Sequence, residues 1–112
     1  MQYLLMIYSN EKEPPADPVA QTDAYRVFTQ SIVQSGHFKG ADRLQPIATA
    51  TTVRVRDGKL MTTDGPFAET REQLGGYYLI DAKDLDEANA IAARIPGART
   101  GVIEVRPIHL MG

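Results

Sequence analysis

Along the chain, apolar positions alternate between the two-residue period of strands and the three- to four-residue period of helices. Residues 3–8 are almost continuously apolar, which indicates a central strand covered on both faces. Asp17 and Pro18 supply an N-cap followed by proline at the first helical position, and Gly36 is a stop signal, so we expect a helix over 18–35. Its predicted core face follows the helical spacing and consists of Ala20, Ala24, Val27, Phe28, Ser31, Ile32 and Ser35.

The middle of the chain predicts a β-hairpin. Residues 37–44 fit either a short strand or an irregular loop, and this alternative stays open. Residues 51–56 are rich in β-branched side chains and alternate with arginines, which indicates a strand. Asp57 and Gly58 form a two-residue hairpin signal, so residues 59–63 are expected to return antiparallel beside that strand.

The last third predicts a strand, a helix and a final strand. Residues 76–80 form a second nearly continuous apolar run, typical of another central strand. Asp84 with Glu87 has the spacing of a capping box. The helix that follows is expected to bury Leu85, Ala88, Ile91, Ala92 and Ile95 before Pro96 and Gly97 end it. Residues 102–108 alternate again and predict the last strand.

This order, β-α-β-hairpin-β-α-β, predicts an α+β fold: a ferredoxin-like sandwich with an inserted hairpin, in one domain spanning 1–112, with both helices on one face of the sheet. The other face would then carry Arg54, Arg56, Glu104, Arg106 and either Tyr77 or Tyr78. That surface is too amphipathic for a dry core and too apolar for bare solvent. Two such faces meeting in a homodimer would enclose a cleft.

Composition excludes several classes of function. Twelve basic and fourteen acidic residues give a net charge of −2, so no partner nucleic acid or anionic membrane is expected. The chain has no cysteine and only two histidines, which lie far apart, so we expect no metal site and no cofactor. The apolar start is too short to span a bilayer and lacks a basic leader, so we expect a cytoplasmic protein.

The most informative segment begins with Asp64-Gly65-Pro66-Phe67. Asp-Gly-Pro is a turn signal, because glycine tolerates positive φ and proline drives the residue before it out of the α region. Asp64 is the candidate catalytic acid or base; its alternative role is to accept hydrogen bonds within its own turn. Glu69, Arg71 and Glu72 are candidate ligand-binding residues, and the two glutamates are spaced to share a helical face. The alternative for them is a solvated turn.

Three further candidate ligand-binding residues lie outside this segment. His37 follows Gly36, where an imidazole either covers the last helical carbonyls or serves as a general base. The Arg54 guanidinium is suited to hold a carboxylate or phosphate, unless it belongs to a solvated strand face. Tyr77 and Tyr78 must point to opposite faces of their strand, and Tyr78 is our candidate for the cleft, although the sequence does not decide between the two.

Beyond these patterns, the sequence resembles the DGPF-domain branch of the YCII-related family over essentially its whole length. The resemblance is carried by the Asp64-Gly65-Pro66-Phe67 and Gly75-Gly76-Tyr77-Tyr78 motifs and by residues 44–46, 48–59 and 105–107. It implies a dimeric α/β-barrel built from ferredoxin-like chains. Of a His–Asp pair proposed as catalytic in the YCII branch, only the aspartate has a counterpart here, Asp64, because residues 18–35 contain no histidine. Arg71 stands where the family pattern has lysine.

Three functions fit these observations. The first is a small-molecule enzyme that performs metal-free acid–base chemistry in the dimer cleft, with a small anionic ligand held by Arg54 or Arg71. The second is a ligand-sensing module that uses the same cleft without turnover. The third is a protein-interaction module whose partner would be a sigma factor, which the resemblance alone suggests because related domains are attached to such factors.

Overall fold

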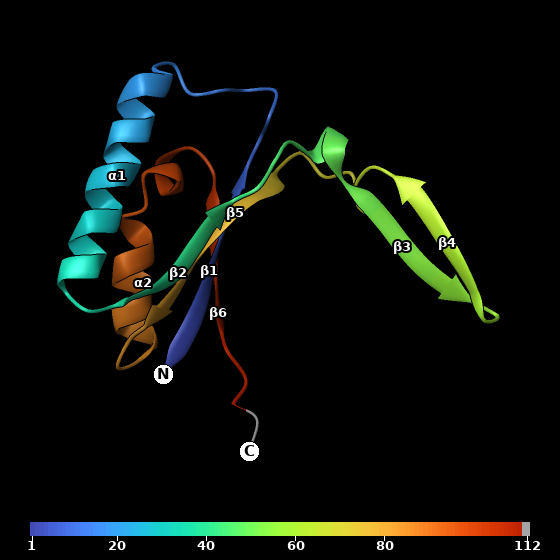
Figure 1. Cartoon of the computed structure of the whole chain (residues 1–112). Coiled ribbons are helices and arrows are strands. Elements are labelled where there is room, and N and C mark those ends of the chain that lie inside the picture. Colours follow the sequence, from blue (N-terminus) through green and yellow to red (C-terminus); the bar gives the residue numbers. More distant parts are fainter. Residues whose placement is uncertain (111–112) are drawn as a thin grey trace.

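The computed structural model describes residues 1–110 of the chain. Figure 1 shows a sheet with two helices on one side and a long hairpin that projects on the other. The elements in chain order are β1 (Gln2–Ser9), α1 (Pro18–Gln34), β2 (Phe38–Arg43), η1 (Ile47–Thr49), β3 (Thr51–Arg56), β4 (Lys59–Asp64), β5 (Gln73–Asp81), α2 (Leu85–Ala93), η2 (Pro96–Arg99) and β6 (Val102–Pro107). The two η elements are single 3₁₀ turns.

The main sheet has the strand order β2-β5-β1-β6, and its neighbouring strands all run antiparallel. This is the ferredoxin-like order, so the predicted α+β fold with two helices is confirmed. The predicted hairpin is also confirmed, but β3 and β4 form a separate two-stranded sheet that does not extend the main one. Residues 37–44, for which a strand and a loop were both open, contribute the edge strand β2.

Local capping explains where the helices begin and end. The Asp17 side chain accepts the Ala20 N–H at 3.0 Å, and Pro18 occupies the first turn of α1. Asp84 caps α2 by accepting the Glu87 N–H at 2.9 Å. The Glu87 carboxylate reaches one residue further back than in a capping box and accepts the Lys83 N–H at 3.1 Å.

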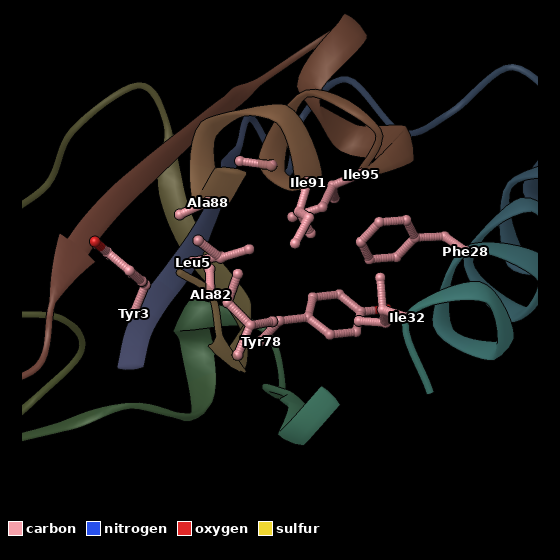
Figure 2. Packing of buried hydrophobic residues seen from close by; sticks show 11 residues of the cluster. Tyr3, Leu5, Phe28, Ile32, Tyr78, Ala82, Ala88, Ile91 and Ile95 are labelled. Carbon is pink, nitrogen blue, oxygen red and sulfur yellow. The ribbon is translucent and has the colours of Figure 1, made fainter. Parts of the chain in front are cut away.

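The hydrophobic core lies between the helices and one face of the sheet, as Figure 2 shows. Phe28 of α1 meets Tyr78 of β5 edge to face, with 5.1 Å between ring centroids. The side chains of Leu5, Ile32, Ile80 and Ile95 are almost completely buried in this layer. These residues come from β1, α1, β5 and the junction between α2 and η2, so the core joins the helices to the sheet.

The predicted helix faces were partly wrong. Ala20, Ala24 and Val27 of α1 are exposed, and the buried stripe runs instead through Tyr25, Phe28 and Ile32. The stripe is rotated because Tyr25, a polar-tipped residue, turns inward and its hydroxyl accepts the Gly97 N–H at 3.1 Å. Similarly, Leu85 at the start of α2 is exposed, whereas Ala88, Ile91, Ala92 and Ile95 are buried as predicted.

The strand register shows what occupies the sheet face opposite the helices, which we call the open face. Across β6, β1, β5 and β2, one row contains Glu104, Met6, Tyr77 and Asp42, and the next contains Arg106, Leu4, Leu79 and Gly40. The centre of this face is therefore apolar, and its charges lie on the two edge strands. Both helices pack on the opposite side of the sheet (Figure 1), although Met6 on this face is only 9% exposed.

Candidate functional site

The Asp64 turn lies where the hairpin joins the body of the protein. Asp64 is the last residue of β4, and Gly65 adopts a φ of 97°, as the Asp-Gly-Pro signal predicted. The Gly65 N–H donates to the Ala50 carbonyl at 2.7 Å, and the Thr52 hydroxyl donates to the Gly65 carbonyl at 2.8 Å. These bonds hold the turn through its backbone, so the exposed Asp64 carboxylate is left available.

The segment after this turn is irregular, so the expectation that Glu69 and Glu72 share a helical face is wrong. Pro66 to Glu72 contains no helix, and Glu69 is exposed. Gln73 holds the segment in place: its buried side-chain amide donates to the Thr70 carbonyl at 2.6 Å and to the Ala68 carbonyl at 3.4 Å. Sequence reasoning gave Gln73 no role, although it is the polar residue that shapes this loop.

One ion pair and one hydrogen-bonded carboxylate join the β1–α1 connection to this region. Arg71 pairs with Glu13 at 3.6 Å, and both side chains are largely exposed. Glu11 accepts the Ile47 N–H with both carboxylate oxygens, at 3.1 and 3.3 Å. Three connecting segments therefore meet at one end of the main sheet. Arg71 contacts the β1–α1 connection and forms no ion pair with Asp64, Glu69 or Glu72 among the described contacts.

The two adjacent tyrosines have opposite positions, and the choice of Tyr78 for the cleft is corrected. Tyr78 is only 6% exposed in the core, where its hydroxyl lies 2.7 Å from the Thr29 hydroxyl and burial raises its pKa. Tyr77 lies on the open face and donates to the Asp42 carboxylate at 2.6 Å. This hydrogen bond raises the Tyr77 pKa, so the phenol stays protonated at neutral pH.

The Tyr77–Asp42 pair is a chemical feature that the sequence did not reveal. The pair forms because Asp42 lies opposite Tyr77 in the register of β2 against β5. The sequence could not predict this register, because residues 37–44 fitted either a strand or a loop. Asp42 is near the end of β2, but Tyr77 is in the middle of β5, so the pair lies within the sheet, and residues 73–76 of β5 separate it from the connecting segments. Here a carboxylate, a phenol and the apolar Met6 adjoin one another on the open face.

Arg54 and Arg56 are not on the main sheet, which corrects the prediction for the open face. Both belong to β3 and are exposed on the projecting hairpin. The Arg56 guanidinium donates to the adjacent Val55 carbonyl at 3.0 Å. Glu104 and Arg106 do lie on the open face, as predicted, and they form an ion pair with each other on β6.

His37 lies at the opposite end of the sheet, so the structure does not bring it to Asp64. Its ring contacts the Ser35 hydroxyl at 2.7 Å and the Glu87 carboxylate at 3.1 Å, which links the end of α1 to the start of α2. The Lys83 backbone N–H and the His37 ring together lower the Glu87 pKa. Among the described contacts the ring reaches no carbonyl of α1, so the predicted capping role is wrong in detail: the ring bridges two helices, and only the His37 backbone N–H donates to the Ile32 carbonyl.

Neither a metal centre nor a membrane helix is evident in residues 1–110. In this described part of the chain, no group of three or more His, Asp or Glu side chains is placed to hold a metal ion. No helix in that range is long and apolar enough to cross a membrane. A surface hollow of about 620 Å³ is lined by α1 residues alone, among them Tyr25, Arg26 and Thr29, and receives nothing from the Asp64 turn.

The comparison with protein families decides the classification. A model of the YCII-related domain matches residues 1–111. The chain belongs to the YCII-related family. An uncharacterized protein of Rhizobium meliloti (strain 1021) is 38% identical to this YCII-related protein, and the alignment covers 98% of this chain and 94% of the relative.

A solved structure supports the fold. The 5-chloro-2-hydroxyhydroquinone dehydrochlorinase of Burkholderia phenoliruptrix, in complex with 2,5-dihydroxybenzoquinone, is similar with a TM-score of 0.51. The match covers 97% of this YCII-related chain and 94% of the dehydrochlorinase, at 12% sequence identity. At that identity the similarity extends to the fold and not to the chemistry.

Two glycines test how much the Asp64 turn depends on its backbone. Gly65 has a φ of 97° and Gly58, at the hairpin tip, has a φ of 75°, and alanine adopts either conformation at a cost. We expect Gly65→Ala and Gly58→Ala each to lower the free energy of unfolding by about 1 kcal/mol or more. Chemical denaturation at one protein concentration measures this, and a neutral Gly65→Ala variant would contradict the assigned turn.

Proposed function

We propose that this YCII-related protein acts as a homodimer that binds a small anionic molecule in a cleft between two open faces, beside the Asp64 turn. The Asp64 carboxylate is the acid–base group of the site, and the chemistry needs no metal. The Tyr77 phenol and Asp42 lie within the open face, on β5 and β2. Leu4 and Leu79 supply its apolar floor, next to Met6, which is only 9% exposed.

The observation that carries this proposal is the chemistry of the open face. An apolar centre with a few convergent polar groups is the usual composition of a small-molecule site. The Tyr77 hydroxyl donates its single proton to Asp42, so its oxygen and the Asp42 carboxylate are left to accept hydrogen bonds from the hydroxyl groups of a ligand. A single chain leaves this surface open, because the helices cover only the other side of the sheet. A second copy would convert the face into an enclosed cleft.

The fold comparison supplies a probe for this proposal. The Burkholderia dehydrochlorinase binds a planar hydroxyquinone on a similar fold. Hydroxyquinones are acidic, and their flat rings suit an apolar floor with polar groups at the edge. We therefore expect 2,5-dihydroxybenzoquinone, or a small carboxylic acid of similar size, to bind this protein.

The test replaces Asp64 by asparagine, which keeps the shape of the side chain and removes its charge. Asparagine still caps the turn, so the free energy of unfolding should change by less than about 0.5 kcal/mol. We expect the affinity for the hydroxyquinone, measured by titration calorimetry, to fall at least about tenfold, equivalent to about 1.4 kcal/mol.

Asp86→Asn is the control. Asp86 is an exposed aspartate in the first turn of α2, on the side of the sheet opposite the open face. This variant should bind the probe like the wild type. Marked unfolding of Asp64→Asn would show that Asp64 is structural, and unchanged binding by a folded Asp64→Asn would remove it from the site.

A further inference from the structure

The hairpin β3–β4 exposes apolar side chains that its own chain does not cover. Val53, Val55 and Leu60 are 59%, 60% and 70% exposed, and all six residues of β4 are exposed. An isolated two-stranded hairpin is at best marginally stable in water. Phe67, just beyond the base of the hairpin, is 81% exposed. The hairpin therefore needs a covering surface.

The register separates the hairpin into two chemically different faces. Val53 and Val55 pair with Thr62 and Leu60, so these four side chains share an apolar face. The opposite face contains Met61, Thr52 and Thr63 together with three cations: Arg54, Arg56 and Lys59. The apolar face is suited to pack on an apolar partner surface, while the cations of the other face attract a partner of net negative charge over a longer range.

The body of the same protein offers such a surface. The hairpin projects on the side of the open face, away from the helices (Figure 1). Residues 52–63 carry three cations and one carboxylate, a net charge of +2 in a chain of −2, so the remaining residues carry −4. The open face is apolar at Leu4, Met6 and Leu79. Since each copy has one hairpin and one open face, a twofold dimer satisfies both at once.

From these observations we infer that the β3–β4 hairpin is an exchanged arm, whose apolar face packs on the second copy of this chain and closes the partner's cleft. The arm's apolar face does not dock on its own body, because Val53, Val55 and Leu60 stay largely exposed in the single chain. The occupant of the apolar face is thus a second copy of the chain.

This inference rests on the proposed function and extends it. The apolar face of the arm packs on the partner, so Arg54, Arg56 and Lys59 on the opposite face point away from the closed cleft. The arm therefore contributes an apolar cover to the ligand site, and the polar groups of the site come from the copy that it covers. A monomer would leave the ligand site uncovered.

Hydrogen exchange of the wild-type protein tests the arm directly. At a concentration where the dimer forms, the β3 and β4 backbone amides should exchange about a hundredfold or more slowly than those of an open chain. This protection should disappear on dilution below the dimer dissociation constant. Protection that persists on dilution would show that the hairpin is held by its own chain, and would overturn the inference.

A double variant, Val55→Asp with Leu60→Asp, places charges on the apolar face of the arm. Both side chains are exposed in a single chain, so the body should still fold. Sedimentation should show that the dimer dissociation constant rises at least about tenfold, since unpaired charges would be buried in the interface. The control is Val19→Asp with Val27→Asp on the exposed side of α1, which should dimerise like the wild type.

The outcomes separate the arm from the dimer. If the arm variant keeps wild-type dimer affinity and the wild-type hairpin exchanges freely within the dimer, the arm inference is overturned while the proposed cleft remains. If the wild-type protein is a monomer at all accessible concentrations, both proposals are overturned.

Discussion

Gly101→Ala is expected to destabilise the protein by about 3 kcal/mol or more, at the top of the range for overpacking. A Cβ at Gly101 would lie far inside van der Waals contact with the Tyr8 backbone carbonyl oxygen, and close to the Gly97 carbonyl as well. Backbone atoms cannot turn aside as a flexible side chain does. The strain would separate β1 from β6 at the Tyr8–Val102 pair, where β6 begins.

Gly75→Ala is the matched control for this substitution. At Gly75 an added Cβ would meet its nearest neighbours, the Ile7 carbonyl and the Ser9 hydroxyl, at 3.9 Å, which is ordinary contact. Denaturant unfolding at one protein concentration compares the two variants. Equal stability of the Gly101 and Gly75 variants would contradict the close approach of β1 to the start of β6.

Ile80→Ala is expected to lower the free energy of unfolding by about 2–5 kcal/mol, a large share of the stability of a domain this size. Ile80 is completely buried on β5, between Tyr3 of β1 and Phe38 of β2. Removing its outer carbons loses apolar burial and leaves a cavity that a central strand cannot close. Thermal or denaturant unfolding measures the effect.

Val19→Ala serves as the exposed control. Val19 is 81% exposed in the first turn of α1, so truncation there should change stability by no more than about 0.5 kcal/mol. A loss at Val19 comparable with that at Ile80 would show that the assigned core is incorrect.

The strands and helices were predictable because their signals are local. The Asp17 cap, the Asp57-Gly58 turn and the two apolar runs each depend on neighbouring residues, and the structure has all of them. The faces of the helices were less predictable. Tyr25 turns toward the core, where its hydroxyl accepts a hydrogen bond from Gly97, 72 residues away. Periodicity alone carries no information on this contact, and it assigned the buried face of α1 to Ala20, Ala24 and Val27, which are exposed.

The candidate site was predictable only in part, because its geometry depends on contacts distant in sequence. The Asp64 turn and the positive φ of Gly65 follow from Asp-Gly-Pro. The Tyr77–Asp42 pair joins residues 35 positions apart and depends on a strand register that the sequence left open. His37 is equally instructive: its chemistry suggested a site residue, but the fold places it against Glu87 at the other end of the sheet.

The most direct test of the account is the mass of the wild-type protein in solution. The proposed cleft exists only where two open faces meet, so the protein should be a dimer at low micromolar concentration. Sedimentation equilibrium should then return about twice the chain mass of 12.3 kDa. A homogeneous species of 12.3 kDa at that concentration would contradict the cleft and the function assigned to it.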